Sequence, residues 1–202
     1  MPGTVNRTTR NVPQPATRSP AQLPRFRAQL RRQRTRCFVA LGSNINQPLL
    51  QLRRAVQALD TLPQSSLQHC SSVYRSQAMG PGQQPDYLNA VAEIRTALRP
   101  HALLAALKRI ERRAGRVYQR RWSARPLDLD ILLYGHLSYR SRSLTIPHAG
   151  LMQRNFVLGP LLEIAAGLAL PNGRALDTNM LQGLPGRLQK MPQPLWPRRR
   201  QR

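Results

Sequence analysis

The sequence predicts an α+β fold with an antiparallel sheet, helices packed on one of its faces and a further helix at the C-terminal side. Short apolar runs of strand length alternate along the chain with longer segments of helical period. Their order is strand, helix, strand, strand, helix, strand. This βαββαβ order is that of the split βαβ, or ferredoxin-like, arrangement.

The predicted strands are short apolar or alternating segments bounded by turn residues. We expect them at residues 37–41, 67–75, 87–96 and 127–134, with a short extended piece at 144–148. The first strand ends at Gly42, and Asn44 or Asn46 can cap the helix that follows. In the third strand, alternate residues such as Ala90 and Ala92 share one face.

The predicted helices carry apolar residues three and four positions apart. We expect them at residues 48–59, 100–115 and 156–166. Pro100 fits the first turn of its helix, where a missing N–H is tolerated. Gly115 marks the end of the same helix.

The charge of the chain is unusual, because 32 lysines and arginines face 8 acidic residues, for a net charge of +24. Residues 1–36 hold nine arginines and no acid, and we expect a disordered basic tail there. Residues 174–202 are also basic, and we expect an irregular tail. The domain is therefore predicted at residues 37–173, and its remaining positive charge suits an anionic substrate.

The location that the sequence predicts is the cytoplasm. No segment has the roughly 20 apolar residues that span a bilayer, and no apolar signal-peptide core is present, so no membrane contact is expected. An Arg-rich, acid-free leader also resembles an organelle transit peptide, which is the alternative. Cys37 and Cys70 give no disulfide framework and are expected to be buried thiols.

Two carboxylates, Asp128 and Asp130, lie two positions apart in the predicted strand 127–134. Residues at this spacing point to the same face of a strand, so the two carboxylates are neighbours. Neighbouring like charges need a cation, and Mg²⁺ prefers carboxylate oxygens that it shares with phosphates. Two solvated aspartates on an edge strand are the alternative reading.

Basic residues surround this acidic pair in the sequence. Arg116, Arg121 and Arg125 precede it in a loop that also contains Trp122, and His148 follows it. Carboxylates beside arginines predict a metal bound together with a polyphosphate. A solvated loop is the alternative for the arginines. No Gly-rich P-loop and no kinase catalytic-loop signature is present.

An aromatic residue and an amide, Tyr87 and Asn89, share one face of the predicted strand 87–96. Such a pair suits a planar heterocycle, because the ring can stack while the amide reads an edge. Phe156 can form the opposite wall. A core tyrosine, a turn asparagine and a core phenylalanine are the commoner explanations.

Several segments together resemble the 6-hydroxymethyl-7,8-dihydropterin pyrophosphokinase family. They are residues 40–44 (ALGSN), 72–75 (SVYR), 80–89 (GPGQQPDYLN), 110–111 (IE), 115–117 (GRV), 121–122 (RW), 125–131 (RPLDLDI) and 144–148 (LTIPH). The resemblance covers about residues 37–173, with a loop between Val117 and Trp122 that looks one residue short. It implies a ferredoxin-like fold and transfer of pyrophosphate from ATP to the pterin, giving AMP, in folate biosynthesis.

The resemblance also implies roles for individual residues. Asp128 and Asp130 would hold two Mg²⁺, and Arg116 and Arg125 would be catalytic with them. The residues expected to bind the pterin are Met79, Tyr87, Asn89 and Phe156. The residues expected to bind ATP are Glu111, Arg121, Trp122, Thr145, His148 and Arg154.

Two other functions fit parts of the sequence. The charge of +24 suggests a nucleic-acid-binding module on a ferredoxin-like sheet, although no aromatic run for stacking bases is present. An inactive homologue is the other alternative, against which Asp128, Asp130 and His148 argue. We expect a monomer whose basic tails can bind RNA non-specifically beside the two small-molecule substrates.

Overall fold

The computed structural model describes residues 34–79, 83–117 and 123–196. Contacts divide the chain into residues 1–33 and residues 34–202, and the fold below is that of the second unit. Most of the predicted basic tail at residues 1–36 lies outside the described part. The first strand, β1 (Thr35–Ser43), begins two residues before the predicted domain boundary.

The main sheet has six strands in the order β5-β1-β4-β3-β8, with β2 pairing beside β3 on β4. Its elements in chain order are β1, α2 (Pro48–Asp60), β2 (Ser65–Cys70), β3 (Tyr74–Ser76), β4 (Tyr87–Thr96), α3 (Pro100–Arg113) and β5 (Asp128–Tyr134). All the neighbouring strands are antiparallel. This confirms the predicted ferredoxin-like order, except that the segment 67–75 is divided between β2 and β3.

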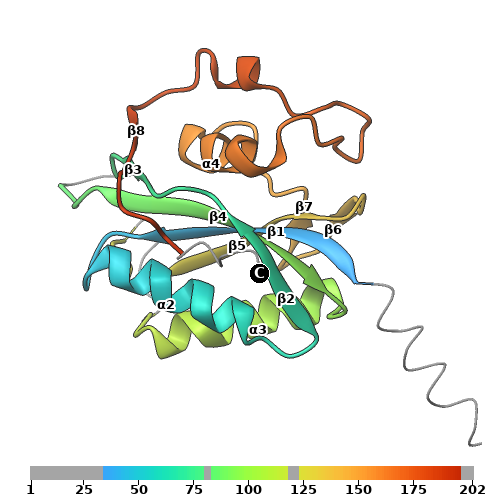
Figure 1. Cartoon of the computed structure of the whole chain (residues 1–202), viewed down its shortest axis with the longest axis horizontal. Helices are drawn as coiled ribbons and strands as arrows, with labels where there is room; N and C mark the ends of the chain where they lie inside the picture. The colour runs from blue at the N-terminus through green and yellow to red at the C-terminus, as the bar shows by residue number, and fades with distance from the viewer. Residues whose placement is uncertain (1–33, 80–82, 118–122, 197–202) are drawn as a thin grey trace, which may run out of the picture. The chain divides into compact units, whose positions relative to one another are not determined.

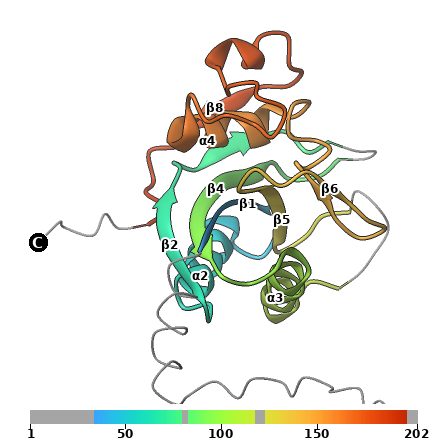
Figure 2. The same cartoon turned by 90° about the vertical axis from the view of Figure 1, so that its right-hand side faces the viewer.

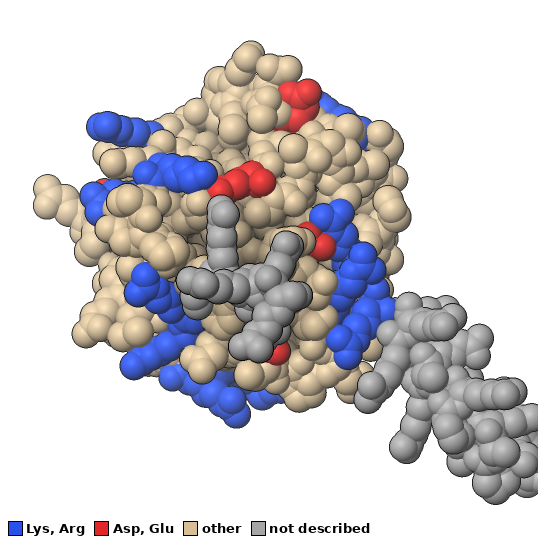
Figure 3. Space-filling model, in the orientation of Figure 1, with Lys and Arg blue, Asp and Glu red and all other residues tan. Residues whose placement is uncertain are grey.

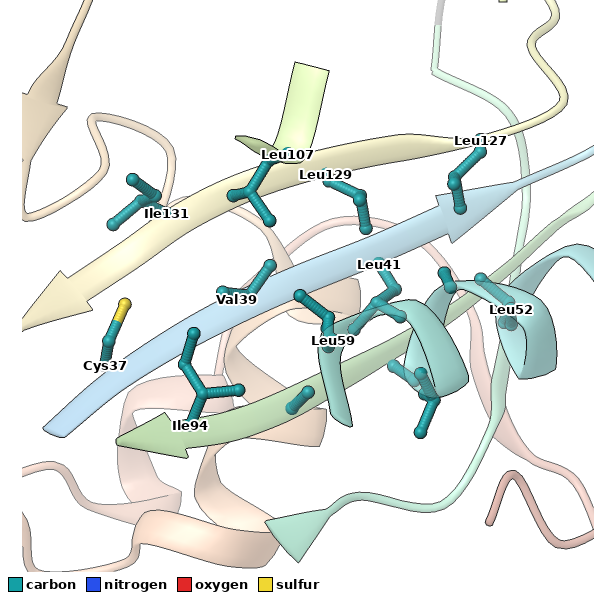
Figure 4. Packing of buried hydrophobic residues seen from close by; sticks show 14 of the residues in the cluster. Cys37, Val39, Leu41, Leu52, Leu59, Ile94, Leu107, Leu127, Leu129 and Ile131 are labelled. Carbon is teal, nitrogen blue, oxygen red and sulfur yellow. The ribbon is translucent and has the colours of Figure 1, made fainter. Parts of the chain in front are cut away.

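The helices α2 and α3 cover one face of the sheet (Figures 1 and 2). In α2 the buried residues Leu52, Ala55, Val56 and Leu59 follow the helical period that predicted it. They pack against alternate residues of β1, β4 and β5, including Val39, Ile94 and Leu129 (Figure 4). This is the larger of two hydrophobic cores.

The opposite face is covered by α4 (Asn155–Ala165), which forms a second core with residues such as Phe38, Val91 and Leu132 (Figure 2). Side chains at odd and even positions of the same strands therefore pack into two different cores. Between β5 and α4 lies a small antiparallel pair, β6 (Tyr139–Arg140) and β7 (Thr145–Ile146), followed by a cis Ile146–Pro147 bond.

The expectation of an irregular tail after residue 173 is wrong for part of that segment. A 3₁₀ turn, η2 (Thr178–Leu181), contacts α4, and β8 (Leu188–Lys190) pairs with β3. Leu195 is 3% exposed and belongs to the larger core. The folded unit therefore extends at least to residue 196, and a boundary at Gly173 would cut through it.

Three smaller observations complete the fold. Neither Asn44 nor Asn46 caps α2, whose N-cap position is occupied by Gln47 without a side-chain hydrogen bond. Cys37 and Cys70 are free thiols, the first buried and the second partly buried, and burial raises the pKa of Cys70 to about 12. Among the described helices, none combines the length and the apolar character needed to cross a membrane.

Candidate functional site

A cavity of about 330 Å³ opens on the α4 face of the sheet, where β1 ends and β4 and β5 begin. Ala40 and Gly42 of β1 and Leu132 of β5 line it, together with the first turn of α4. The predicted site residues that also line it are Arg116, Arg125, Asp128, Asp130, Met79, Tyr87, Asn89, His148, Arg154 and Phe156. The structure therefore brings together side chains from widely separated parts of the sequence.

Strand register places the two aspartates beside the cavity. Asp128 pairs with Gly42 and Asp130 with Ala40, while the alternate residues Leu127 and Leu129 point into the larger core. A side chain at Gly42 would fill the space between Asn89 and Asp128. A Cβ atom there would lie 3.5 Å from Asn89 Oδ1 and 3.9 Å from Asp128 Cβ.

Asp128 is held by two arginines. The guanidinium of Arg116 donates to Oδ1, and that of Arg125 donates to Oδ2 at 2.9 Å. Burial opposes ionisation of this carboxyl, but the positive charges of Arg116, Arg125 and Lys108 outweigh it and lower its pKa. Asp128 is therefore ionised at neutral pH. Asp130 has a looser partner, because Lys108 Nζ lies 3.7 Å from its Oδ1.

Glu111 lies beneath this acidic pair and is fully buried. Its Oε1 accepts from Lys108 Nζ at 2.8 Å and from the Leu129 amide at 2.7 Å, and Arg116 Nη1 lies 2.7 Å away. Its Oε2 has no hydrogen-bond partner among the described residues. Burial raises the pKa of Glu111, and the neighbouring cations only partly oppose this. Glu111 thus anchors two cations, each of which also reaches one aspartate.

His148 faces the acidic pair from the segment after β7. Its backbone N–H donates to Leu132 O at 2.9 Å, and its Nδ1 accepts from the Gly150 N–H at 3.1 Å. The neutral ring therefore carries its proton on Nε2 and can donate from that atom. Burial lowers the pKa of His148, and the charge of Arg154 acts in the same direction, although Asp130 opposes both.

The other side of the cavity is aromatic and polar. Tyr87 and Asn89 point into it from β4, and Phe156 lines it from α4. The side-chain amide of Asn89 is 5% exposed and donates to Ser76 Oγ at 2.9 Å. This fixed amide, in a cavity that two aromatic rings also line, suits a planar heterocycle with polar edges.

Some predicted residues lie elsewhere. Thr145 in β7 and the buried Glu111 are not among the lining residues. Arg121 and Trp122 lie outside the described residues. Sequence reasoning missed Lys108, for which a signal existed: it lies three positions before Glu111 on a helix, the spacing of a side-chain ion pair.

The acidic pair has the donor set of a hard-cation site. Its carboxylate oxygens suit Mg²⁺, which completes an octahedral shell with waters and phosphate oxygens. No cluster of three or more potential metal-ligating side chains occurs in the described segments. A metal held here would therefore take most of its ligands from a bound phosphate and from water, with arginines placed for the remaining phosphate oxygens.

Comparison with known proteins agrees with this geometry. A family model described as 7,8-dihydro-6-hydroxymethylpterin-pyrophosphokinase (HPPK) matches residues 38–166. Relatives named 2-amino-4-hydroxy-6-hydroxymethyldihydropteridine pyrophosphokinase are 50% identical over 139 residues in Haemophilus influenzae and 45% identical over 141 residues in Pseudomonas aeruginosa. The matches cover 69% and 70% of this chain and 87% of each relative.

A solved structure shows the same fold in a longer protein. The wild-type HPPK-DHPS of Plasmodium falciparum matches with a TM-score of 0.52 and 11% identity, over 75% of this chain and 44% of that chain. The sequence matches span both the acidic pair and the aromatic side of the cavity. On these grounds the chain belongs to the 7,8-dihydro-6-hydroxymethylpterin-pyrophosphokinase family.

Proposed function

We propose that the chain transfers the pyrophosphoryl group of ATP to the hydroxymethyl oxygen of 6-hydroxymethyl-7,8-dihydropterin, giving AMP and the pterin diphosphate for folate biosynthesis. Family membership supports the pyrophosphokinase activity. One structural observation carries the proposal to this site: a single cavity is lined by two carboxylates, by the four cations Lys108, Arg116, Arg125 and Arg154, and by an aromatic–amide pair. These are the groups that a phosphate chain and a planar heterocycle require.

In the reaction, the hydroxymethyl oxygen attacks the β-phosphorus, and the bond from that phosphorus to the α,β-bridging oxygen breaks. AMP leaves with the bridging oxygen. Such transfers depend mainly on positioning and on stabilising charge. Tyr87, Phe156 and Asn89 would orient the pterin. Arg116 and Arg125 would stabilise the charge that develops on the transferred group.

Two Mg²⁺ are proposed as cofactors, held by Asp128 and Asp130 together with the ATP phosphates. The carboxylate pair fits them because both side chains face one cavity and Asp128 is ionised at neutral pH. When bound, the metals would supply charge neutralisation on the phosphates and activation of the attacking hydroxyl. His148, with Nε2–H as a donor, would hydrogen-bond to a phosphate oxygen.

The remaining expectations concern assembly and location. We propose a cytoplasmic monomer. RNA binding by the basic tails is an expectation that falls largely on residues outside the described part, at 1–33 and 197–202. On the face shown in Figure 3, lysines and arginines lie in separate groups with acidic residues between them.

The test is a product assay with ATP, Mg²⁺ and 6-hydroxymethyl-7,8-dihydropterin. We expect AMP and the pterin diphosphate, with AMP release abolished in Asp130→Ala and retained in Asp177→Ala, a control at the exposed start of η2. Circular dichroism would establish that both variants fold. Formation of ADP, or equal turnover by Asp130→Ala, would contradict the proposal.

A further inference from the structure

The side chain of Asn44, which directly follows β1, joins two loops of the site. It is 2% exposed. Its Oδ1 accepts from the Arg125 backbone N–H at 2.8 Å, and its own backbone N–H donates to Arg125 O at 3.2 Å. On the other side its Nδ2 donates to Pro85 O at 3.2 Å, with Gln84 Oε1 at 3.5 Å. The oxygen of this buried amide is thus bound by one loop and its nitrogen by another.

The two loops serve opposite halves of the cavity. Residues 83–86 lead directly into β4, whose first residues Tyr87 and Asn89 form the aromatic–amide side. Residues 123–126 carry Arg125, whose guanidinium binds Asp128 on the acidic side. A shift in the backbone at Arg125 would therefore move an atom that also anchors the loop before Tyr87.

Local structure does not account for this arrangement. Asn44 does not cap α2, so its amide is not required to begin the helix that follows it. An amide that held only one loop would need only one of its two partners, the Arg125 N–H or Pro85 O. A planar amide fixed at both ends is rigid, and it transmits a displacement from one partner to the other.

We propose that Asn44 is a positioning residue that couples the two substrate subsites, so that binding of the nucleotide phosphates beside Arg125 organises the loop before Tyr87 for the pterin. This rests on the proposed function. Coupling between two binding sites is reciprocal, so bound pterin strengthens nucleotide binding by the same factor. A longer bond, 3.4 Å from the Tyr87 hydroxyl to Ser123 O, also joins these segments, so loss of Asn44 reduces the coupling rather than abolishing it.

The test uses Asn44→Asp, which keeps the acceptor for the Arg125 N–H but loses the donor to Pro85 O. Asn46→Asp is the matched control, because Asn46 is exposed and its substitution introduces the same negative charge two residues away. The dissociation constant of 6-hydroxymethyl-7,8-dihydropterin is measured with and without Mg²⁺ and α,β-methylene-ATP, in which the bond that breaks is replaced by carbon. The ratio of the two constants is the coupling factor.

We expect a coupling factor of about 10 in the wild type and in Asn46→Asp, within the usual range for coupled sites, and about 2 in Asn44→Asp. In Asn44→Asp, pterin affinity should therefore fall more with nucleotide bound than without it. An unchanged factor in Asn44→Asp, an equal fall in Asn46→Asp, or a wild-type factor near 1 would overturn the proposal. Each of these results can occur in a chain that still forms AMP, so failure here differs from failure of the proposed function.

A measurement on the wild type covers the case in which Asn44→Asp does not fold. Amide hydrogen exchange at Arg125 reports the bond to Asn44 Oδ1 directly. Pterin alone should slow exchange at this amide, because ordering of the loop at Pro85 holds Asn44 in place. Unchanged exchange at Arg125 with saturating pterin would overturn the proposal.

Discussion

Replacing Glu111 by glutamine should lower the activity of this protein while changing its free energy of unfolding only slightly. The side chain keeps its size, and its carbonyl oxygen can still accept from the Leu129 amide. What disappears is the negative charge that anchors Lys108 and Arg116. Neither cation is left without an acid, because Arg116 retains Asp128 and Lys108 lies 3.7 Å from Asp130.

The effect on stability follows from two opposing contributions. Hydrogen bonds to a charged group contribute about 1.5–3 kcal/mol and neutral ones about 0.5–1.5 kcal/mol, so two weakened bonds cost about 2 kcal/mol. A buried carboxylate carries a desolvation penalty of similar or larger size, which glutamine removes. Since burial raises the pKa of Glu111, its ionised form at neutral pH destabilises the folded state. We expect a net change within about 1 kcal/mol, of either sign.

The effect on activity should be larger, because Arg116 and Lys108 lose a fixed anchor. Loss of about 1.5–3 kcal/mol of positioning energy lowers kcat about 10- to 100-fold. Urea unfolding would give the stability and AMP release the rate constant. Glu163→Gln is the matched control, because Glu163 accepts from Ser72 and Lys190 and does not line the cavity. A loss above about 3 kcal/mol in Glu111→Gln, or an unchanged kcat, would refute this reasoning.

Three further predictions concern the cavity and the fold. Gly42→Ala should raise KM for the pterin about 10-fold with little change in stability, because the added Cβ fills the gap beside Asn89 at an ordinary 3.5 Å contact; an unchanged KM would contradict it. The lowered folded-state pKa of Asp128 gives stability that is present above its unfolded pKa of about 4 and is lost as the pH falls through the folded value. Asp128→Asn should therefore flatten the loss of stability below about pH 4, and an unaltered pH profile in urea titrations would count against this. Leu195→Ala should cost about 2–4 kcal/mol, against less than about 1 for the 37% exposed Leu50→Ala, and equal effects would place Leu195 outside the core.

The sequence predicted the central elements well because their patterns are local. The strand predicted at residues 87–96 agrees with β4 to the residue, and residues 89–94 are all buried because both faces of this strand pack against a core. The division of the second strand was not predictable. Ser71 Oγ accepts the Val91 N–H that a backbone carbonyl would otherwise bind, and no local pattern reveals this exchange.

Parts of the site and of the C-terminal segment depend on contacts distant in sequence. Lys108 lies on a polar helix surface and looks solvated until β5 brings Asp130 beside it. Residues 188–190 are too short and too polar to show a strand period, and their pairing with β3 comes from the tertiary fold. By contrast, the spacing of Asp128 and Asp130 fixed their shared face, because strand alternation requires no tertiary information.

The pairing of β8 with β3 also bears on aggregation. Without β8, the short strand β3, which carries Ser76 into the cavity wall, would present unpaired backbone groups to other chains. The outer edge then belongs to β8, which is three residues long, carries Lys190 and is followed by Pro192. Short, charged and proline-flanked edges are poor templates for strand addition. The C-terminal segment thus protects the wall of the cavity from pairing with neighbouring molecules.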